Sequence, residues 1–242
     1  MILRRVLVLL LCFWLAVPAY GAEAEKYVAL TFDDGPSGRF TRRLLEGLRQ
    51  RQVCVTFLLC GYRLAEDPGL AAQMLQAGHE IGLHGYSHKN MAAMSRHAVA
   101  KELSDTLSLL PTGYRPTFFR PPGGAFSENT RQAARDAGLA ILNWSVDPLD
   151  WKIHDTAAVE AAVLEQTRDG DVILLHDLCD CSVDAALAII DKLQAQGFRF
   201  VTASQLARQK GITPQPGKVY RRFRPAVPAT AGEAALPPDR SN

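Results

Sequence analysis

The sequence has almost no net charge, with 27 Lys and Arg residues against 25 Asp and Glu residues. Proteins that bind nucleic acid or anionic membranes through charge usually carry a clear excess of basic residues. We therefore expect neither partner for this protein. The chain shows no internal repeat, and 48% of its 242 residues are apolar, which excludes a wholly disordered protein and suits one domain with a sizeable core.

Long apolar runs are also scarce, and the one at the N-terminus is short for a membrane span. A short segment, residues 1–5, is basic through Arg4 and Arg5 and precedes an apolar run from Val6 to Val17, which Pro18 ends. This pattern is typical of a secretory signal peptide, here residues 1–24, cleaved between Gly21 and Ala24. An uncleaved anchor is the alternative, but a spanning helix needs about 20 apolar residues. We expect export to the periplasm, the cell envelope or the medium, with no stable anchor after cleavage.

Cysteine is rare, and its spacing does not resemble a structural zinc site, which would usually use Cys-x-x-Cys pairs. Removal of Cys12 with the signal peptide leaves four cysteines, an even number that permits disulfides in an oxidising compartment. Cys54 and Cys60 lie about 20 Å apart if their run is extended, too far to pair with each other. A bridge from Cys60 to Cys179 or Cys181 and a set of unpaired cysteines remain alternatives.

Short apolar segments alternate with segments of helical spacing along most of the chain. This alternation predicts an α/β fold with a parallel sheet or barrel. The expected strands are residues 27–30, 53–59, 80–83, 117–119, 139–146, 171–175 and 198–201. The expected helices are residues 39–51, 68–77, 95–110, 127–137, 156–168, 183–196 and 204–210. We expect residues 25–210 to form the domain and the Pro- and Ala-rich residues 211–242 to form a mostly disordered tail.

Residues whose side chains can bind a metal ion or take part in proton transfer follow the predicted strands. Because α/β barrels gather their site at the carboxyl ends of the strands, these residues should meet in one bowl. They are Asp33, Asp34, His84, His88, Arg120, Asp150 and His176.

Asp34, His84 and His88 together suit a metal ion. Two histidines and one carboxylate fill three positions of zinc and leave room for water or substrate. The aspartate pair and the histidine pair are each weak evidence for a metal site when taken alone. Asp-Asp-Gly is also an ordinary turn sequence, and a His pair is often one buried and one surface residue. The combination with the other segments carries the inference.

Five short segments at the ends of the predicted strands belong together. They are Thr31-Phe32-Asp33-Asp34-Gly35-Pro36, His84-Gly85-Tyr86-Ser87-His88, Arg120-Pro121-Pro122-Gly123-Gly124, Asp147-Pro148-Leu149-Asp150-Trp151 and Leu174-Leu175-His176. In this order they resemble the NodB homology domain of polysaccharide deacetylases, the fourth carbohydrate esterase family. The resemblance covers residues 27–206.

The resemblance implies a distorted parallel (β/α) barrel of about seven strands and a metal-dependent deacetylation. It implies that Asp34, His84 and His88 hold a divalent metal ion. Zinc is the expected ion, and cobalt can substitute for it. Asp33 would be the general base, oriented by Arg120. His176 would be the general acid, kept protonated by Asp150.

The same resemblance gives the walls of the site. The backbone N–H of Gly123 is the candidate oxyanion donor, and Trp151 and Leu174 would pack around the acid. We expect Trp144 to belong to the core rather than to form a sugar platform, and we assign no role to His154.

Two departures from the family pattern stand out. Gly85 replaces the Ser or Thr that usually braces the metal loop, so we expect weaker metal binding. Gly123 stands where family members commonly have Tyr. The loss of that side chain opens one wall of the cleft, so this motif does not identify the substrate.

The expected substrate is an N-acetylated polysaccharide or oligosaccharide: peptidoglycan, a chitin oligomer or poly-N-acetylglucosamine. Alternatives are an esterase for O-acetylated sugars such as xylan, a catalytically silent glycan-binding barrel, and a related barrel that opens cyclic amides. We expect a monomer.

Overall fold

The structure is a computed structural model that describes residues 25–224. The predicted signal peptide, residues 1–24, lies outside the described residues, as do residues 225–242 of the predicted tail. Between residues 25 and 224, none of the helices has the length and apolar content that a membrane crossing requires.

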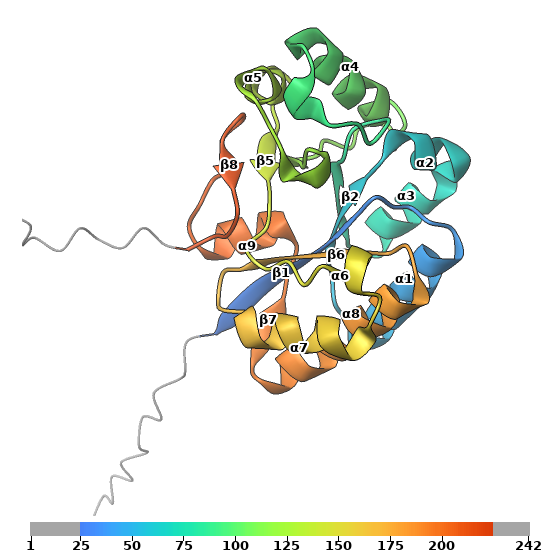
Figure 1. The fold of residues 1–242 in the computed structure, drawn as a ribbon, viewed down its shortest axis with the longest axis vertical. Helices are drawn as coiled ribbons and strands as arrows, with labels where there is room; N and C mark the ends of the chain where they lie inside the picture. Colours follow the sequence, from blue (N-terminus) through green and yellow to red (C-terminus); the bar gives the residue numbers. More distant parts are fainter. Residues whose placement is uncertain (1–24, 225–242) are drawn as a thin grey trace, which may run out of the picture.

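A curled parallel sheet forms the centre of the molecule (Figure 1). Its strands follow the order β6-β1-β2-β3-β4-β5-β8, and β7 pairs with the beginning of β1. This continuous path of seven strands confirms the predicted α/β fold with a distorted parallel barrel. The strands are β1 (Lys26–Asp33), β2 (Thr56–Leu59), β3 (Glu80–Leu83), β4 (Phe118–Phe119), β5 (Ala140–Leu142), β6 (Val172–His176), β7 (Phe198–Phe200) and β8 (Val219–Tyr220).

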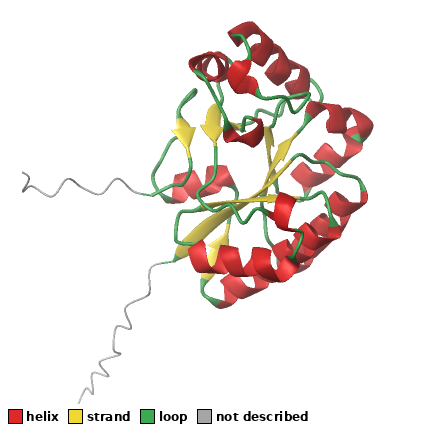
Figure 2. Ribbon diagram, viewed as in Figure 1, coloured by secondary structure: helices red, strands yellow, loops and turns green. Residues whose placement is uncertain are grey.

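Helices cover the outside of the sheet (Figure 2). The α-helices are α1 (Arg39–Arg51), α2 (Gly61–Glu66), α3 (Pro68–Gln76), α4 (Arg96–Leu107), α5 (Glu128–Asp136), α6 (Asp150–Ile153), α7 (Thr156–Gln166), α8 (Asp180–Ala195) and α9 (Ala203–Gln209). Two 3₁₀ turns, η1 (Met91–Ala93) and η2 (Pro122–Gly124), lie in loops. Two serines cap their helices: Ser95 accepts a hydrogen bond from the Ala98 N–H, and Ser127 forms a capping box with Thr130.

The pairing of the strands places the chemistry at one edge. In the register of β1 and β6, Asp33 lies opposite His176, the last residue of its strand. The segment after β5 also returns to the sheet, because Val146 forms a bridge with Ile173 of β6. The carboxyl ends of β1, β5 and β6 are therefore neighbours.

The apolar runs of the sequence form the core. Both faces of the central strands are covered, so these strands read as continuous apolar stretches. All four residues of β2 and of β3 are buried, and the rings of Phe32 and Phe57 stack with centroids 5.6 Å apart.

The predicted tail begins too early, and the prediction is wrong for residues 211–224. Val219 and Tyr220 form β8, which pairs with β5, and the side chain of Phe223 is fully buried. The Phe223 ring stacks on Tyr220 with centroids 5.4 Å apart and also packs against Phe118. Backbone hydrogen bonds, among them the one from the Phe223 N–H to the Gly170 carbonyl oxygen, also hold this polar, proline-containing segment on the sheet. The domain extends at least to residue 224.

The cysteines pair in a way that the sequence analysis did not consider. Cys179 and Cys181 form a disulfide across a single residue, with Cα atoms 5.4 Å apart. Cys60 is buried and free, so the bridge from Cys60 is wrong. Cys54 is free and partly exposed.

Candidate functional site

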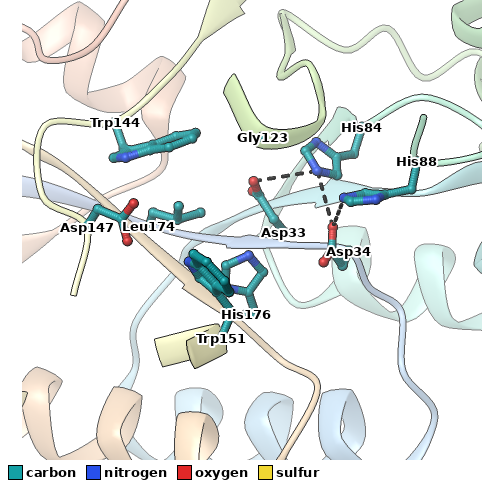
Figure 3. A pocket seen from close by; sticks show the side chains of 10 residues that line it. All are labelled: Asp33, Asp34, His84, His88, Gly123, Trp144, Asp147, Trp151, Leu174 and His176. Atoms are coloured by element: carbon teal, nitrogen blue, oxygen red, sulfur yellow. Dashed lines mark ion pairs between the residues drawn. The ribbon is translucent and has the colours of Figure 1, made fainter. Parts of the chain in front are cut away.

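A cleft of about 340 Å³ lies at the carboxyl ends of the strands (Figure 3). Figure 3 shows Asp34, His84 and His88 at one end of it and Trp144, Asp147 and Leu174 at the other. Its lining comes from five strand ends and the loops that follow them. These residues are Asp33, Asp34, His84, His88, Gly123, Trp144, Asp147, Trp151, Leu174 and His176.

The structure brings together the three predicted metal ligands. Asp34 Oδ1 lies 3.2 Å from His84 Nε2 and 2.9 Å from His88 Nε2. Asp34 and His88 both adopt left-handed backbone conformations, with φ of 71° and 57°. These turns direct the side chains toward His84, which directly follows β3.

The contacts of this cluster suit a cation. His84 Nδ1 lies 2.8 Å from the carbonyl oxygen of Arg120, which can only accept, so this nitrogen carries the proton. The lone pair of His84 Nε2 is then free to face Asp34, an arrangement typical of a histidine ligand. Asp34 Oδ1 is buried without a hydrogen-bond partner, although two imidazole nitrogens are close. A divalent metal ion would satisfy all three groups.

The electrostatics of Asp34 agree with this assignment. Burial alone would raise the pKa of Asp34, but its contacts with His84 and His88 outweigh burial and hold the pKa below its usual range. Asp34 is therefore an anion, as a metal ligand must be.

A glutamate braces the loop between the two histidines. Glu102 of α4 accepts hydrogen bonds from the backbone N–H groups of Tyr86 and Ser87 at 2.7 and 2.8 Å, and from the Ser87 hydroxyl at 2.6 Å. The loop lacks the expected hydroxyl at Gly85, yet it is not left without support. Gly85 has φ of 79°, a left-handed conformation that favours glycine, so glycine suits this position.

Arg120 is fully buried and organises the base side of the cleft. Its Nη1 lies 2.5 Å from Asp33 Oδ1, and its other nitrogens donate to the carbonyl oxygens of Leu142 and Asn143. Burial lowers the pKa of Arg120, and the charge of Asp33 opposes this effect. The pair leaves Asp33 Oδ2 on the other side of the carboxylate, 3.7 Å from His84 Nε2.

His176 and Asp150 form a second pair across the cleft. Asp150 Oδ1 lies 2.8 Å from His176 Nδ1, and Oδ2 accepts from the backbone N–H of His176 at 2.9 Å and from the Ser182 hydroxyl at 2.7 Å. Burial would lower the pKa of His176, but the hydrogen bond and charge of Asp150 raise it to about 9. His176 is therefore a cation near neutral pH.

The other predicted residues, Gly123, Trp151 and Leu174, also line the cleft. Gly123 has φ of 64°, and no atom lies within 4 Å of the position of a Cβ, so the wall is open at this point. Trp151 is 54% exposed at the rim.

Two residues of the cleft were not predicted from the sequence. Trp144 lines it, and the expectation of a core position is wrong, because the residue follows the end of β5 and stands over the Arg120 guanidinium at 5.5 Å. Asp147 also lines the cleft. The expected strand, residues 139–146, is longer than β5 (Ala140–Leu142), so Trp144 was placed inside a strand and not among the residues that follow one.

Comparison with known proteins gives consistent matches. The family model for polysaccharide deacetylases matches residues 20–142. The peptidoglycan-N-acetylglucosamine deacetylase PgdA of Listeria monocytogenes is 36% identical over 201 residues, which cover 82% of this chain and 42% of that protein. A peptidoglycan-N-acetylglucosamine deacetylase of Bacillus cereus is 36% identical over 192 residues, which cover 77% of this chain and 90% of that protein.

A solved structure matches the fold. The family 4 acetyl xylan esterase from Clostridium thermocellum, in complex with a cobalt ion, aligns with a TM-score of 0.76 at 33% identity. The match covers 81% of this chain and 98% of that one. This chain spans about two fifths of the length of the Listeria relative, so that protein contains further sequence beyond the match.

Proposed function

Because this chain belongs to the polysaccharide deacetylase family, we propose that it is a metal-dependent hydrolase that removes acetyl groups from an N-acetylated glycan. One observation carries the proposal: the Asp33–Arg120 pair and the Asp34, His84 and His88 cluster face the His176–Asp150 pair across one cleft. A hydrolase of this type needs a base and an acid on opposite sides of the bond that breaks.

Asp34, His84 and His88 would hold the metal ion, for which we propose zinc. A zinc ion bound there would polarise the acetyl carbonyl and lower the pKa of a water molecule beside it. Cobalt is the alternative ion, because the Clostridium thermocellum relative was solved with cobalt.

Asp33 would accept the proton of the attacking water. Arg120 binds Oδ1 and leaves Oδ2 as the free oxygen, so the two oxygens have separate tasks. Since Arg120 is itself fixed by two backbone carbonyls, the carboxylate cannot rotate away from the cleft. This fixed orientation favours transfer of the water proton to Asp33 Oδ2.

His176 would donate a proton to the leaving amine. An amine leaves poorly as an anion, so protonation during bond breaking is needed. Asp150 keeps the ring protonated through Nδ1, and Nε2 remains for the substrate. Gly123 would stabilise the oxyanion through its N–H, and Trp144, Trp151 and Leu174 would contact the sugar.

For the substrate we propose peptidoglycan, a chitin oligomer or poly-N-acetylglucosamine. The names of the Listeria and Bacillus relatives favour peptidoglycan. A second candidate is an O-acetyl esterase, favoured by the xylan esterase match and by the open wall at Gly123. We also infer export, from residues 1–24, and a monomeric state.

The test is acetate release from chitin oligomers, peptidoglycan and acetylated xylan, after chelation and again after zinc or cobalt is added. Metal-dependent release from the N-acetylated substrates supports the proposal, and release from xylan alone supports the esterase. Asp33→Asn is the matched control for contaminating activity. If zinc binds but no substrate releases acetate, the silent glycan-binding barrel becomes the better account.

A further inference from the structure

The Cys179–Cys181 disulfide lies at the beginning of α8, close to the proton donor. Cys179 is the N-cap residue of α8, and its Sγ accepts a hydrogen bond from the Ser182 N–H at 3.3 Å. Both cysteines are partly exposed, so a thiol in solution can reach them. Figure 1 shows α6 next to the beginning of α8.

Ser182 links this disulfide to the catalytic pair. The Ser182 hydroxyl donates its one proton to Asp150 Oδ2 at 2.7 Å. The Ser182 Oγ itself lies 3.4 Å from Cys179 Sγ. Asp150 in turn binds both Nδ1 and the backbone N–H of His176. A single residue therefore connects a cysteine sulfur to the carboxylate that holds the proposed acid.

The second cysteine contacts the segment that follows α6. Cys181 Sγ lies 3.9 Å from His154 Nδ1, and the Thr156 hydroxyl donates to the Cys181 carbonyl oxygen at 3.2 Å. Other charged groups at this corner are Asp180 on α8, together with Arg39 and Arg43 of α1, which both pair with Asp180.

This disulfide is poorly placed to act as a structural staple. A disulfide stabilises a fold chiefly by closing a loop in the unfolded chain, and the effect grows with loop length. Here the loop contains one residue between the cysteines. Exposed disulfides are also the ones that exchange readily with other thiols.

We propose that Cys179–Cys181 is a thiol-exchange site that is reduced by a dithiol and that controls the hydrogen bond from Ser182 to Asp150. The inference rests on the proposed function, since the pair it controls is the proposed proton donor. The fitting partner is a dithiol of the thiol–disulfide oxidoreductase type.

The exchange is a two-electron reaction. A thiolate of the partner attacks Cys181 Sγ, the Cys179–Cys181 bond breaks, and Cys179 leaves as a thiolate. The α8 N-terminus and the Ser182 N–H stabilise this leaving group. The second thiol of the partner then loses its proton and attacks the partner sulfur that is bonded to Cys181 in the mixed disulfide. This step releases Cys181, which takes up a proton. The partner ends as a disulfide, and both cysteines are reduced.

Reduction would change the hydrogen bonds of Ser182. A Cys179 thiolate is a stronger acceptor than a disulfide sulfur, and it competes with Asp150 for the single hydroxyl proton. Asp150 then loses one donor and holds the His176 proton more tightly. We expect the reduced enzyme to turn over about threefold to tenfold more slowly, the effect of one hydrogen bond.

The first experiment measures the exchange without any substrate. The full chain is equilibrated with dithiothreitol buffers of graded potential, alkylated and analysed by mass spectrometry, in a Cys12→Ala, Cys54→Ala background that removes Cys12 and the partly exposed thiol of Cys54. We expect reversible two-electron reduction of the pair under native conditions, with Cys60 unmodified. A pair that stays oxidised until the protein unfolds would overturn the proposal.

The second experiment follows His176 in both redox states. We expect its Nδ1–H resonance to shift on reduction, with a parallel change of kcat where acetate release is detected. In Ser182→Ala the redox state should no longer move this resonance, and Cys181→Ser should resemble the reduced form. An unchanged resonance sinks the proposal. Failure of the proposed function would instead leave the exchange and the resonance shift intact without acetate release.

Discussion

His84 donates its Nδ1–H to the carbonyl oxygen of Arg120 at 2.8 Å, while the guanidinium of the same arginine holds Asp33. One buried residue thus orients a predicted metal ligand through its backbone and the predicted base through its side chain. The Arg120 backbone N–H also donates to the Leu83 carbonyl oxygen at 2.8 Å, just before His84. The relative position of ligand and base is therefore fixed by the pairing of neighbouring strand ends.

The base can be tested by a change that keeps its shape. Asp33→Asn retains an oxygen for Arg120 but removes the carboxylate that accepts the proton. We expect kcat to fall about 100-fold to 10,000-fold, as for loss of a general base. Zinc content, measured by elemental analysis, should stay at the wild-type value. A variant that lost zinc as well would show that Asp33 acts as a ligand.

The brace on the metal loop gives a second prediction. Glu102→Ala removes three hydrogen bonds to Tyr86 and Ser87, so the loop that carries His88 loses its support. We expect zinc affinity to fall about 10-fold to 100-fold, the usual effect of losing an outer contact of a metal site. Competition with a fluorescent chelator measures this change. Asp105→Ala, on the same helix and ion-paired with Lys101 on the surface, is the matched control and should bind zinc as the wild type does.

The third prediction concerns pH. In metal-free protein the His176 imidazole should titrate near pH 9 rather than near its ordinary 6.5, because Asp150 outweighs burial. The raised pKa stabilises the folded state fully below about 6.5, and this contribution is lost as the pH rises through about 9. NMR titration of the imidazole signals measures it. In Asp150→Asn burial dominates, so the titration should move to lower pH, and an unmoved titration would contradict the assignment.

Metal binding should also be visible in thermal unfolding. Zinc at 100 times its dissociation constant stabilises a folded protein by about 2.7 kcal/mol. For a chain of this size that corresponds to an increase in Tm of about 5–10 °C. His84→Ala should show no such increase, and chelation should return the wild type to its metal-free Tm. An equal increase in both proteins would place the zinc elsewhere.

The fifth prediction tests the end of the domain. Phe223 is fully buried against Phe118 and Tyr220, so Phe223→Ala should lower the free energy of unfolding by about 3–5 kcal/mol. Urea denaturation measures the change. Arg221→Ala, on the exposed neighbour, should stay within about 0.5 kcal/mol of the wild type. A small effect at Phe223 would mean that residues 211–224 contribute little to the fold.

Much of this architecture can be predicted from local patterns. Buried parallel strands give continuous apolar runs, and the residues after them gather at one edge, which is why Asp33, His84, Arg120 and His176 were found together. The caps at Ser95 and Ser127 follow from side-chain chemistry within a few residues. These features depend on short stretches of chain and on one topological rule.

The remaining features depend on contacts between distant segments. Phe223 looked like part of a polar tail because its partners, Phe118 and the backbone beside Gly170, are far away in sequence. Glu102 gave no signal, since only the fold brings α4 to the histidine loop. The Cys179–Cys181 bond is a different case, because it joins two cysteines separated by one residue and was not among the expected pairings.

The left-handed backbone of Asp34 affects which single substitutions could remove its carboxylate from the proposed metal site without unfolding the protein. Among replacements that remove the charge, asparagine tolerates φ of 71° best, and a single nucleotide change converts aspartate to asparagine. The fold would survive that step with little penalty, while the proposed metal site would lose its carboxylate. In one mutation a lineage could therefore give up the proposed hydrolysis and keep a stable protein whose cleft still fits the proposed glycan.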